Sequence, residues 1–264
     1  MSNFFKNKVV IITGASSGIG LATARLLYQN GAKCVLAARR KGLLEKIAKE
    51  LNGSLPIETD VTKKDSLENL VKETLKVFGR IDILINNAGI LIYKPIEQCS
   101  EEELREVMEV NYFGAVGCVN AILPIMKKQG SGAIANVASI AGKLGFPSLG
   151  YYAASKFALV GYSQALRQEI KQYGIFVSAI YPGTVYTPMT EEIIEGAKKK
   201  GKNVLPISAE KVAEKILVAI EKKKSEVFVP RATHFLYFLH FFFPKFTEWL
   251  AWKFRASDPN DFKA

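Results

Sequence analysis

Tyr152 and Lys156 are the pair of residues whose types and spacing could do chemistry. They lie four residues apart just before the apolar-periodic segment FALVGYSQALRQEI, so we expect them on one face of a helix. A cation within roughly 4–6 Å favours a phenolate, and Lys156 should therefore lower the pKa of Tyr152 from its usual value of about 10. A tyrosine tuned in this way can give a proton to a carbonyl oxygen or take one from an alcohol. By itself, such a pair is also a common coincidence on a helix surface.

Two further polar residues could join this pair. Ser139 ends the predicted strand GAIANVAS, and its hydroxyl could hydrogen-bond the same substrate oxygen. Asn111 lies among apolar residues in the middle of a long predicted helix, where asparagine is a mediocre helix former and costly to bury. It is either a buried structural residue or a functional one at a kink.

A glycine turn follows the predicted strand Lys8–Thr13 and precedes a helical pattern. Its glycines, Gly14, Gly18 and Gly20, have the spacing G-x-x-x-G-x-G rather than the common G-x-G-x-x-G. Glycines allow close backbone approach to a pyrophosphate, and a helix N-terminus offers free N–H groups to it. Strand, turn and helix together therefore favour phosphate binding over a plain turn.

The next predicted strand, Lys33–Ala38, ends in Arg39 and Arg40. An NAD site usually has an acidic residue here for the ribose 2′-hydroxyl, whereas an arginine accommodates a 2′-phosphate. The two cations favour NADP(H) as cofactor, and the alternative is a solvated charge pair at a strand end.

Further strands are predicted at Leu55–Thr59, Ile81–Ile85 and Ile175–Tyr181, alternating with helices. This alternation predicts an α/β fold: a Rossmann-type, doubly wound parallel sheet of about seven strands with helices on both faces. Ligands of such sheets bind beyond the carboxyl ends of the strands. The sequence places Asp60, Asn86, Asn87 and Gly89 at that edge, although asparagine and glycine are also ordinary turn residues.

Composition narrows the classes of function. The 264 residues can bury a full core, and three scattered cysteines argue against a disulfide framework and fit a reducing compartment. Only two histidines occur, His234 and His240, and we expect no metal site. The net charge of +11 suits a phosphorylated cofactor or an anionic membrane surface, and no nucleic-acid-binding motif accompanies it. The N-terminus has no signal-peptide pattern, so we expect a cytoplasmic protein.

These motifs together resemble the short-chain dehydrogenase/reductase family. TGASSGIG, Asp60-Val61, NNAG, NYFG, Ser139 before AG, YAASK and PGTVYTPM occur in the family's order and spacing. The resemblance covers about Lys8 to Met189 and extends more loosely to about Pro230.

The resemblance implies a role for each matching residue. Tyr152 would be the general acid or base, Lys156 would lower its pKa and hold the nicotinamide ribose, and Ser139 would orient the substrate oxygen. Asn111 would anchor a water molecule in a proton relay to Lys156. The implied cofactor contacts, beyond Tyr152 and Lys156, come from Gly14, Ser16, Ser17, Gly18, Ile19, Gly20, Arg39, Arg40, Asp60, Val61, Asn87, Ala88, Gly89, Pro182, Gly183, Val185 and Thr187.

Residues 231–264 depart from the family pattern and form an apolar, basic extension beyond a catalytic domain at 1–230. Phe235–Phe243 is almost entirely aromatic and aliphatic, Pro244 interrupts it, and Lys245–Arg255 could form an amphipathic helix. The run is shorter than the roughly 20 residues that span a bilayer. We expect helices that lie in a membrane interface, cover the substrate pocket, or contact another subunit.

The sequence therefore predicts an NADP(H)-dependent oxidoreductase that interconverts a hydrophobic ketone or aldehyde and its alcohol, such as a keto-lipid, steroid or retinoid. We expect a homodimer or homotetramer, peripheral to a membrane if the extension contacts lipid. The alternative function is a catalytically idle NADP(H)-binding sensor or scaffold, although idle chains would be expected to lose part of the Asn111, Ser139, Tyr152 and Lys156 set.

Overall fold

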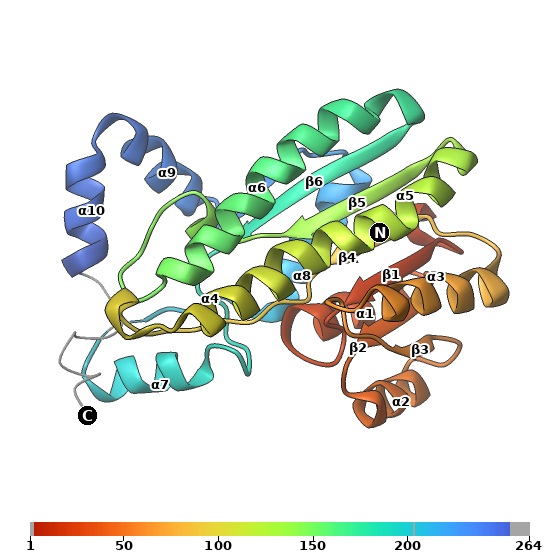
Figure 1. Ribbon diagram of the computed structural model, residues 1–264, viewed down its shortest axis with the longest axis horizontal. Helices are drawn as coiled ribbons and strands as arrows, with labels where there is room; N and C mark the ends of the chain where they lie inside the picture. The colour runs from red at the N-terminus through yellow and green to blue at the C-terminus, as the bar shows by residue number, and fades with distance from the viewer. Residues whose placement is uncertain (1–2, 203, 254–264) are drawn as a thin grey trace.

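The computed structural model describes residues 3–202 and 204–253, which fold around one parallel sheet (Figure 1). The strand order is β3-β2-β1-β4-β5-β6-β7. The chain order reverses between β1 and β4, which is the switch point where such sheets bind ligands. The strands are β1 (Val9–Thr13), β2 (Lys33–Ala38), β3 (Leu55–Glu58), β4 (Ile83–Asn86), β5 (Gly132–Val137), β6 (Ile175–Pro182) and β7 (Glu226–Val229).

Helices cover both faces of the sheet, so the central strands are buried on both sides and are mostly apolar. One apolar layer lies under α1, α2 and α8, and another under α3, α5 and α6. The helices are α1 (Gly18–Gln29), α2 (Lys41–Glu50), α3 (Lys64–Phe78), α4 (Glu101–Met108), α5 (Gly114–Gln129), α6 (Gly150–Ile170), α7 (Glu191–Lys199), α8 (Ala209–Glu221), α9 (Ala232–Phe242) and α10 (Pro244–Lys253). The predicted fold class is confirmed.

A π-helical turn at Glu109–Phe113 joins α4 to α5 in one continuous helical stretch. This stretch, Glu101–Gln129, is long and apolar enough by length and composition to cross a membrane. It packs against α3, β4 and β5, however, so it serves as a core helix of the sheet. Its N-terminus has a capping box between Ser100 and Glu103.

The strand ends differ slightly from the prediction. β4 begins at Ile83 rather than Ile81, and β5 ends at Val137, two residues before Ser139. Ser139 instead caps the short 3₁₀ helix Ile140–Gly142, which places it in a turn at the carboxyl edge of the sheet. The extension is helical: α9 packs on β7 and α10 packs on α9.

Candidate active site

Lys156 is a buried lysine on the first turns of α6. Only 4% of the residue is exposed, and its Nζ donates a hydrogen bond of 3.0 Å to the carbonyl oxygen of Val137 at the end of β5. Burial lowers the pKa of Lys156 from 10.5 to about 8, because the charged form loses its hydration. The Nζ lies 5.6 Å from the ring centroid of Tyr152, so the two side chains share one helix face as predicted.

The expected lowering of the Tyr152 pKa is wrong, because the structure raises it. Burial raises the pKa of this phenol, and a hydrogen bond with Ser139 opposes the rise without cancelling it. The physical reason is that desolvation penalises the phenolate, while Lys156 is directed toward Val137. Tyr152 is therefore held protonated, the form that a general acid for carbonyl reduction needs.

Ser139 is fixed between β5 and β6. Its Oγ accepts a hydrogen bond of 3.1 Å from the N–H of Ala141 and donates one of 3.4 Å to the carbonyl oxygen of Pro182. Because the residue is 8% exposed and is held by backbone groups of the 3₁₀ helix and of the end of β6, its hydroxyl has a defined position beside Tyr152.

Asn111 lies in the π-helical turn and is 1% exposed. Its Oδ1 accepts from the N–H of Ile90 at 2.8 Å, and its Nδ2 donates to the carbonyl oxygen of Ile90 and to the Oγ of Ser155, both at 3.0 Å. The residue thus sits at a helix irregularity and ties the loop after β4 to the helix that carries Tyr152 and Lys156. Both amide hydrogens are used, so a relay water would need another atom of Asn111; that role stays a prediction.

The backbone of the glycine turn lies so close to neighbouring atoms that its glycines could not carry side chains. Gly14 and Gly18 have φ values of +66° and +54°, and a Cβ on Gly20 would lie 2.2 Å from the carbonyl oxygen of Gly14. Ser17 precedes α1 without capping it, unlike Ser100 before α4 and Ser208 before α8. The first N–H groups of α1 therefore lack a side-chain acceptor, which suits a phosphate.

Arg40 reaches the glycine turn from the end of β2. Its guanidinium donates to the Oγ of Ser16 at 2.8 Å and to the Oγ of Ser17 at 2.9 Å. Arg39 lines the same cleft, and its positive charge lowers the pKa of Asp60. Burial raises the pKa of Asp60, but hydrogen bonds from Thr62 and the nearby Arg39 and Lys63 outweigh it and lower that pKa overall.

The Asn-Asn-Ala-Gly segment has a structural role and also faces the cleft. The Nδ2 of Asn87 donates to the carbonyl oxygen of Thr13 at 3.0 Å, and the Oγ1 of Thr13 accepts from the N–H groups of Asn87 and Ala88. These contacts hold the loops after β1 and β4 together. Asn87, Ala88 and Gly89 also line the cleft.

All these elements border one cleft of about 290 Å³ at the carboxyl edge of the sheet. Of the residues predicted for the site, Gly20 and Asn111 do not line it: Gly20 packs against Gly14, and Asn111 supports the wall from behind. The uncapped α1, the tight glycine turn and the cations of Arg39 and Arg40 fit a dinucleotide. Cleft residues that were not among the predicted contacts are Ala38, Thr59, Ile90, Val110, Val137, Ala138, Pro188, Met189 and Thr190.

Thr190 shows what kind of signal was missed. Its Oγ1 donates to the carbonyl oxygen of Val185 and lies 3.1 Å from the Oγ1 of Thr187, so it folds the loop after β6 back on itself. A threonine just past a loop motif has no distinctive pattern. Its position beyond the carboxyl end of β6 was the available clue.

The fold and the site define the chain as an oxidoreductase of the Rossmann type. Residues 8–198 match the family model described as short chain dehydrogenase. The chain is 43% identical over 202 residues to an uncharacterized oxidoreductase of Staphylococcus saprophyticus, covering 75% of this chain and 82% of that protein. It is 34% identical to a dehydrogenase/reductase SDR family protein 7-like of Drosophila melanogaster, covering 94% of this chain and 80% of that protein.

A solved structure agrees with these relatives. A short chain dehydrogenase/reductase from Burkholderia phymatum, in complex with NAD, superposes with a TM-score of 0.83 at 26% identity, covering 98% of this chain and 99% of that one. The chain therefore belongs to the short-chain dehydrogenase/reductase family.

Proposed function

We propose that this protein is an NADP(H)-dependent oxidoreductase that interconverts an apolar ketone or aldehyde and its alcohol. The observation that carries the proposal is that Ser139, Tyr152 and Lys156 line one cleft that is also lined by Arg39 and Arg40. The bound cofactor would supply or accept the hydride.

The side chains of the cleft would supply the proton that the substrate oxygen needs during reduction. Tyr152, held protonated by burial, would donate its proton to the substrate oxygen. Ser139, fixed by Ala141 and Pro182, would orient that oxygen. Lys156 would stabilise the phenolate left behind, since an ammonium group within a few ångströms favours the charged form.

Two features of the lining support the choice of ligands. No acidic residue follows β2 at positions 38–40, and Arg40 is already held over Ser16 and Ser17, where a 2′-phosphate would meet a guanidinium. The apolar residues Ile90, Val110, Pro188 and Met189 line the cleft and favour an apolar substrate. A cytoplasmic homodimer or homotetramer remains our prediction for the assembly.

The activity is tested by NADPH oxidation with a panel of ketones of increasing apolar length. Tyr152→Phe should lower kcat by roughly 10²- to 10⁴-fold, the usual contribution of a general acid, while NADPH fluorescence still shows binding. Tyr151→Phe is the matched control and should keep its turnover. Binding of NADPH without turnover of any ketone or alcohol would instead favour the idle sensor.

The cofactor preference is tested separately. Arg40→Gln should weaken NADPH binding by about 10- to 100-fold, as expected for losing a charge-assisted hydrogen bond. NADH binding should change little. An equal loss for both cofactors would mean that Arg40 only braces the glycine turn.

A further inference from the structure

We propose that α9 and α10 form a docking face for the surface of an anionic lipid bilayer. We call this surface the aromatic face; it consists of Phe235, Phe238, Phe241, Phe242, Phe246 and Trp249. Its link to substrate delivery rests on the proposed function, whereas its binding to lipid does not.

The aromatic face is exposed to an unusual degree. Phe235 is 68% and Phe241 75% exposed, and Phe246 and Trp249 are each about half exposed, at 49% and 52%. Isolated apolar residues on a surface are ordinary, but a contiguous group of large ones marks a site of interaction. These residues lie on two successive helices joined at Phe243, and some contact each other, such as Phe246 and Trp249 at 5.9 Å.

The opposite side of these helices is firmly packed, so the exposure is not a sign of a detached tail. The rings of His234 and Tyr237 lie 4.7 Å and 6.0 Å from the ring of Phe228 on β7. Between the helices, the buried Thr247 bonds the carbonyl oxygen of Pro244 at 2.9 Å and meets His240 at 2.7 Å.

A buried charge cluster further fixes α9 to the body of the protein. Lys143, with 8% of its side chain exposed, pairs with Glu226 at 3.3 Å. The same ammonium lies 4.9 Å from the ring centroid of Tyr181 on β6 and 5.2 Å from that of Tyr237 on α9. Lys143 follows Ser139 by four residues, so the cluster joins the extension to the turn that holds the candidate serine.

The composition of the face favours a bilayer interface over a bilayer span. The helices have 11 and 10 residues, about half of what a membrane crossing needs. Tryptophan and phenylalanine beside cations are typical of helices at the headgroup level, and Lys253 lies 4.9 Å from the ring of Trp249. Arg231, Lys245 and Lys253 outnumber Glu248 in the described part of the extension, which suits anionic lipid.

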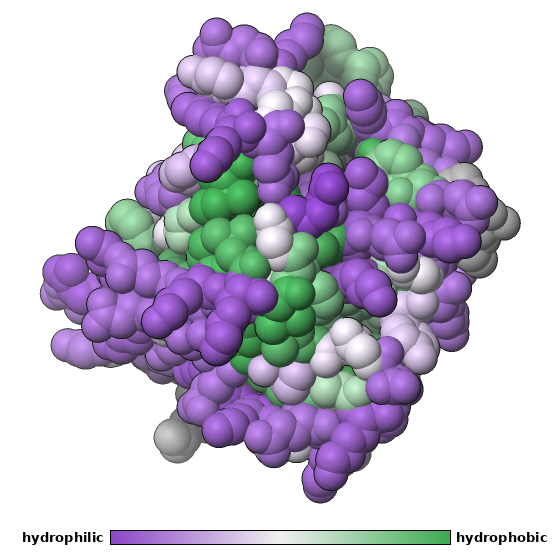
Figure 2. Space-filling view, turned by 90° about the vertical axis from the view of Figure 1, so that its right-hand side faces the viewer, coloured by the Kyte–Doolittle hydropathy of each residue, from purple (hydrophilic) through white to green (hydrophobic). Residues whose placement is uncertain are grey.

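The location of the face matches the route an apolar substrate would take. The strands point toward the end of the molecule where α7, α9 and α10 lie (Figure 1). The cleft opens at that same carboxyl edge. The end of the molecule away from α9 and α10 has hydrophilic residues around a central group of apolar residues (Figure 2). Docking through the aromatic face would therefore bring the cleft toward the bilayer, where apolar ketones dissolve.

The test is sedimentation of the full chain with vesicles of phosphatidylcholine alone or with about a third phosphatidylserine. We expect binding to the anionic vesicles that weakens at high salt, because screening reduces the electrostatic part. The double substitution Phe241→Ser with Trp249→Ser should reduce binding at least about tenfold. The matched control, Leu43→Ser with Val77→Ser, changes exposed apolar residues of α2 and α3 and should bind like the unsubstituted protein.

Three outcomes would overturn the proposal. One is a chain that sediments with neither vesicle; another is equal binding to both, which removes the anionic preference. The third is a protein that binds no vesicles but forms a dimer by light scattering, and whose dimer is dissociated by Phe241→Ser with Trp249→Ser. That result would assign the face to contact with a second copy of the chain. Turnover of a short water-soluble ketone separates the two proposals: the double variant should retain it, whereas Tyr152→Phe should lose it and still bind vesicles.

Discussion

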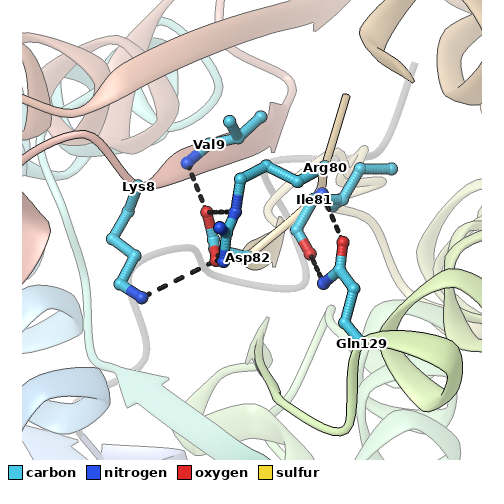
Figure 3. A network of polar contacts seen from close by, with 6 residues as sticks. All are labelled: Lys8, Val9, Arg80, Ile81, Asp82 and Gln129. Carbon is cyan, nitrogen blue, oxygen red and sulfur yellow. Dashed lines mark hydrogen bonds and ion pairs between the residues drawn. The ribbon is translucent and has the colours of Figure 1, made fainter. Parts of the chain in front are cut away.

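Asp82 at the amino edge of the sheet and Lys156 at the carboxyl edge are two buried charges with opposite surroundings. At the amino edge, Asp82 is 5% exposed, and its carboxylate accepts from the N–H of Val9 at 2.9 Å and from the guanidinium of Arg80 at 3.0 Å (Figure 3). Lys8 adds a third partner at 3.7 Å. Beside it, the Gln129 amide pairs with both the N–H and the carbonyl oxygen of Ile81. The buried charge of Asp82 is therefore paired with two cations.

At the carboxyl edge, Lys156 is buried with a carbonyl oxygen as its partner and no ion pair within the described residues. A buried cation without an anion costs stability, and its lowered pKa is the sign of that cost. The paired charge of Asp82 stabilises the amino edge of the sheet, whereas the unpaired charge of Lys156 at the carboxyl edge is suited to a ligand.

Asp82→Ala should destabilise the fold by about 2–4 kcal/mol, because it leaves the buried N–H of Val9 without an acceptor and Arg80 without its anion. Urea denaturation followed by circular dichroism measures the change. Glu101→Ala, which removes an exposed helix ion pair with Arg105, is the control and should cost less than about 0.5 kcal/mol. If both substitutions lowered the free energy of unfolding equally, the buried ion pair of Asp82 would have no special role in stability.

Lys156→Met should stabilise the fold at pH 7 by about 1–2 kcal/mol while abolishing turnover. The folded-state pKa of about 8 lies below the ordinary 10.5, so protonation opposes folding. The cost is complete below pH 8 and disappears as the pH rises toward 10.5, and the advantage of the variant should shrink over that range. Urea denaturation at pH 7 and pH 10 measures both values. A variant less stable than the parent at pH 7 would contradict the contrast.

Glu226→Gln tests the ion pair that joins β7 to the turn at the carboxyl edge of the sheet. Glu226 begins β7 and pairs with Lys143 in the turn after Ser139. Burial raises the Glu226 pKa, but Lys143 and Gln164 outweigh it, so the pKa lies below 4.5 in the folded protein. The ion pair should contribute about 1 kcal/mol at pH 7 and lose it as the pH falls below that value.

Thermal or urea unfolding at pH 7 and at about pH 3 would show this as a gap between parent and variant that narrows strongly in acid. Glu195→Gln, which changes an exposed pair with Lys198, should show little gap at either pH. A gap that persists in acid would exclude the charge of Glu226 as its source.

Local patterns in the sequence predicted the elements and their order. The β-branched runs, the glycine turn and the four-residue spacing of Tyr152 and Lys156 depend on neighbours along the chain, and the structure reproduces them. The carboxyl-edge rule then indicated which loops meet, because parallel strands end together. These signals were sufficient for the fold, whereas most of the residues that line the cleft were indicated only with the help of the family resemblance.

Tertiary structure alone decided the chemical state of those residues. The pKa of Tyr152 rises rather than falls because desolvation depends on every element packed around α6. The partners of Asn111, at Ile90 and Ser155, and those of Arg40, at Ser16 and Ser17, lie more than 20 residues away in the chain. Spacing along a chain determines which side chains share a face, whereas burial and charge are properties of the assembled core.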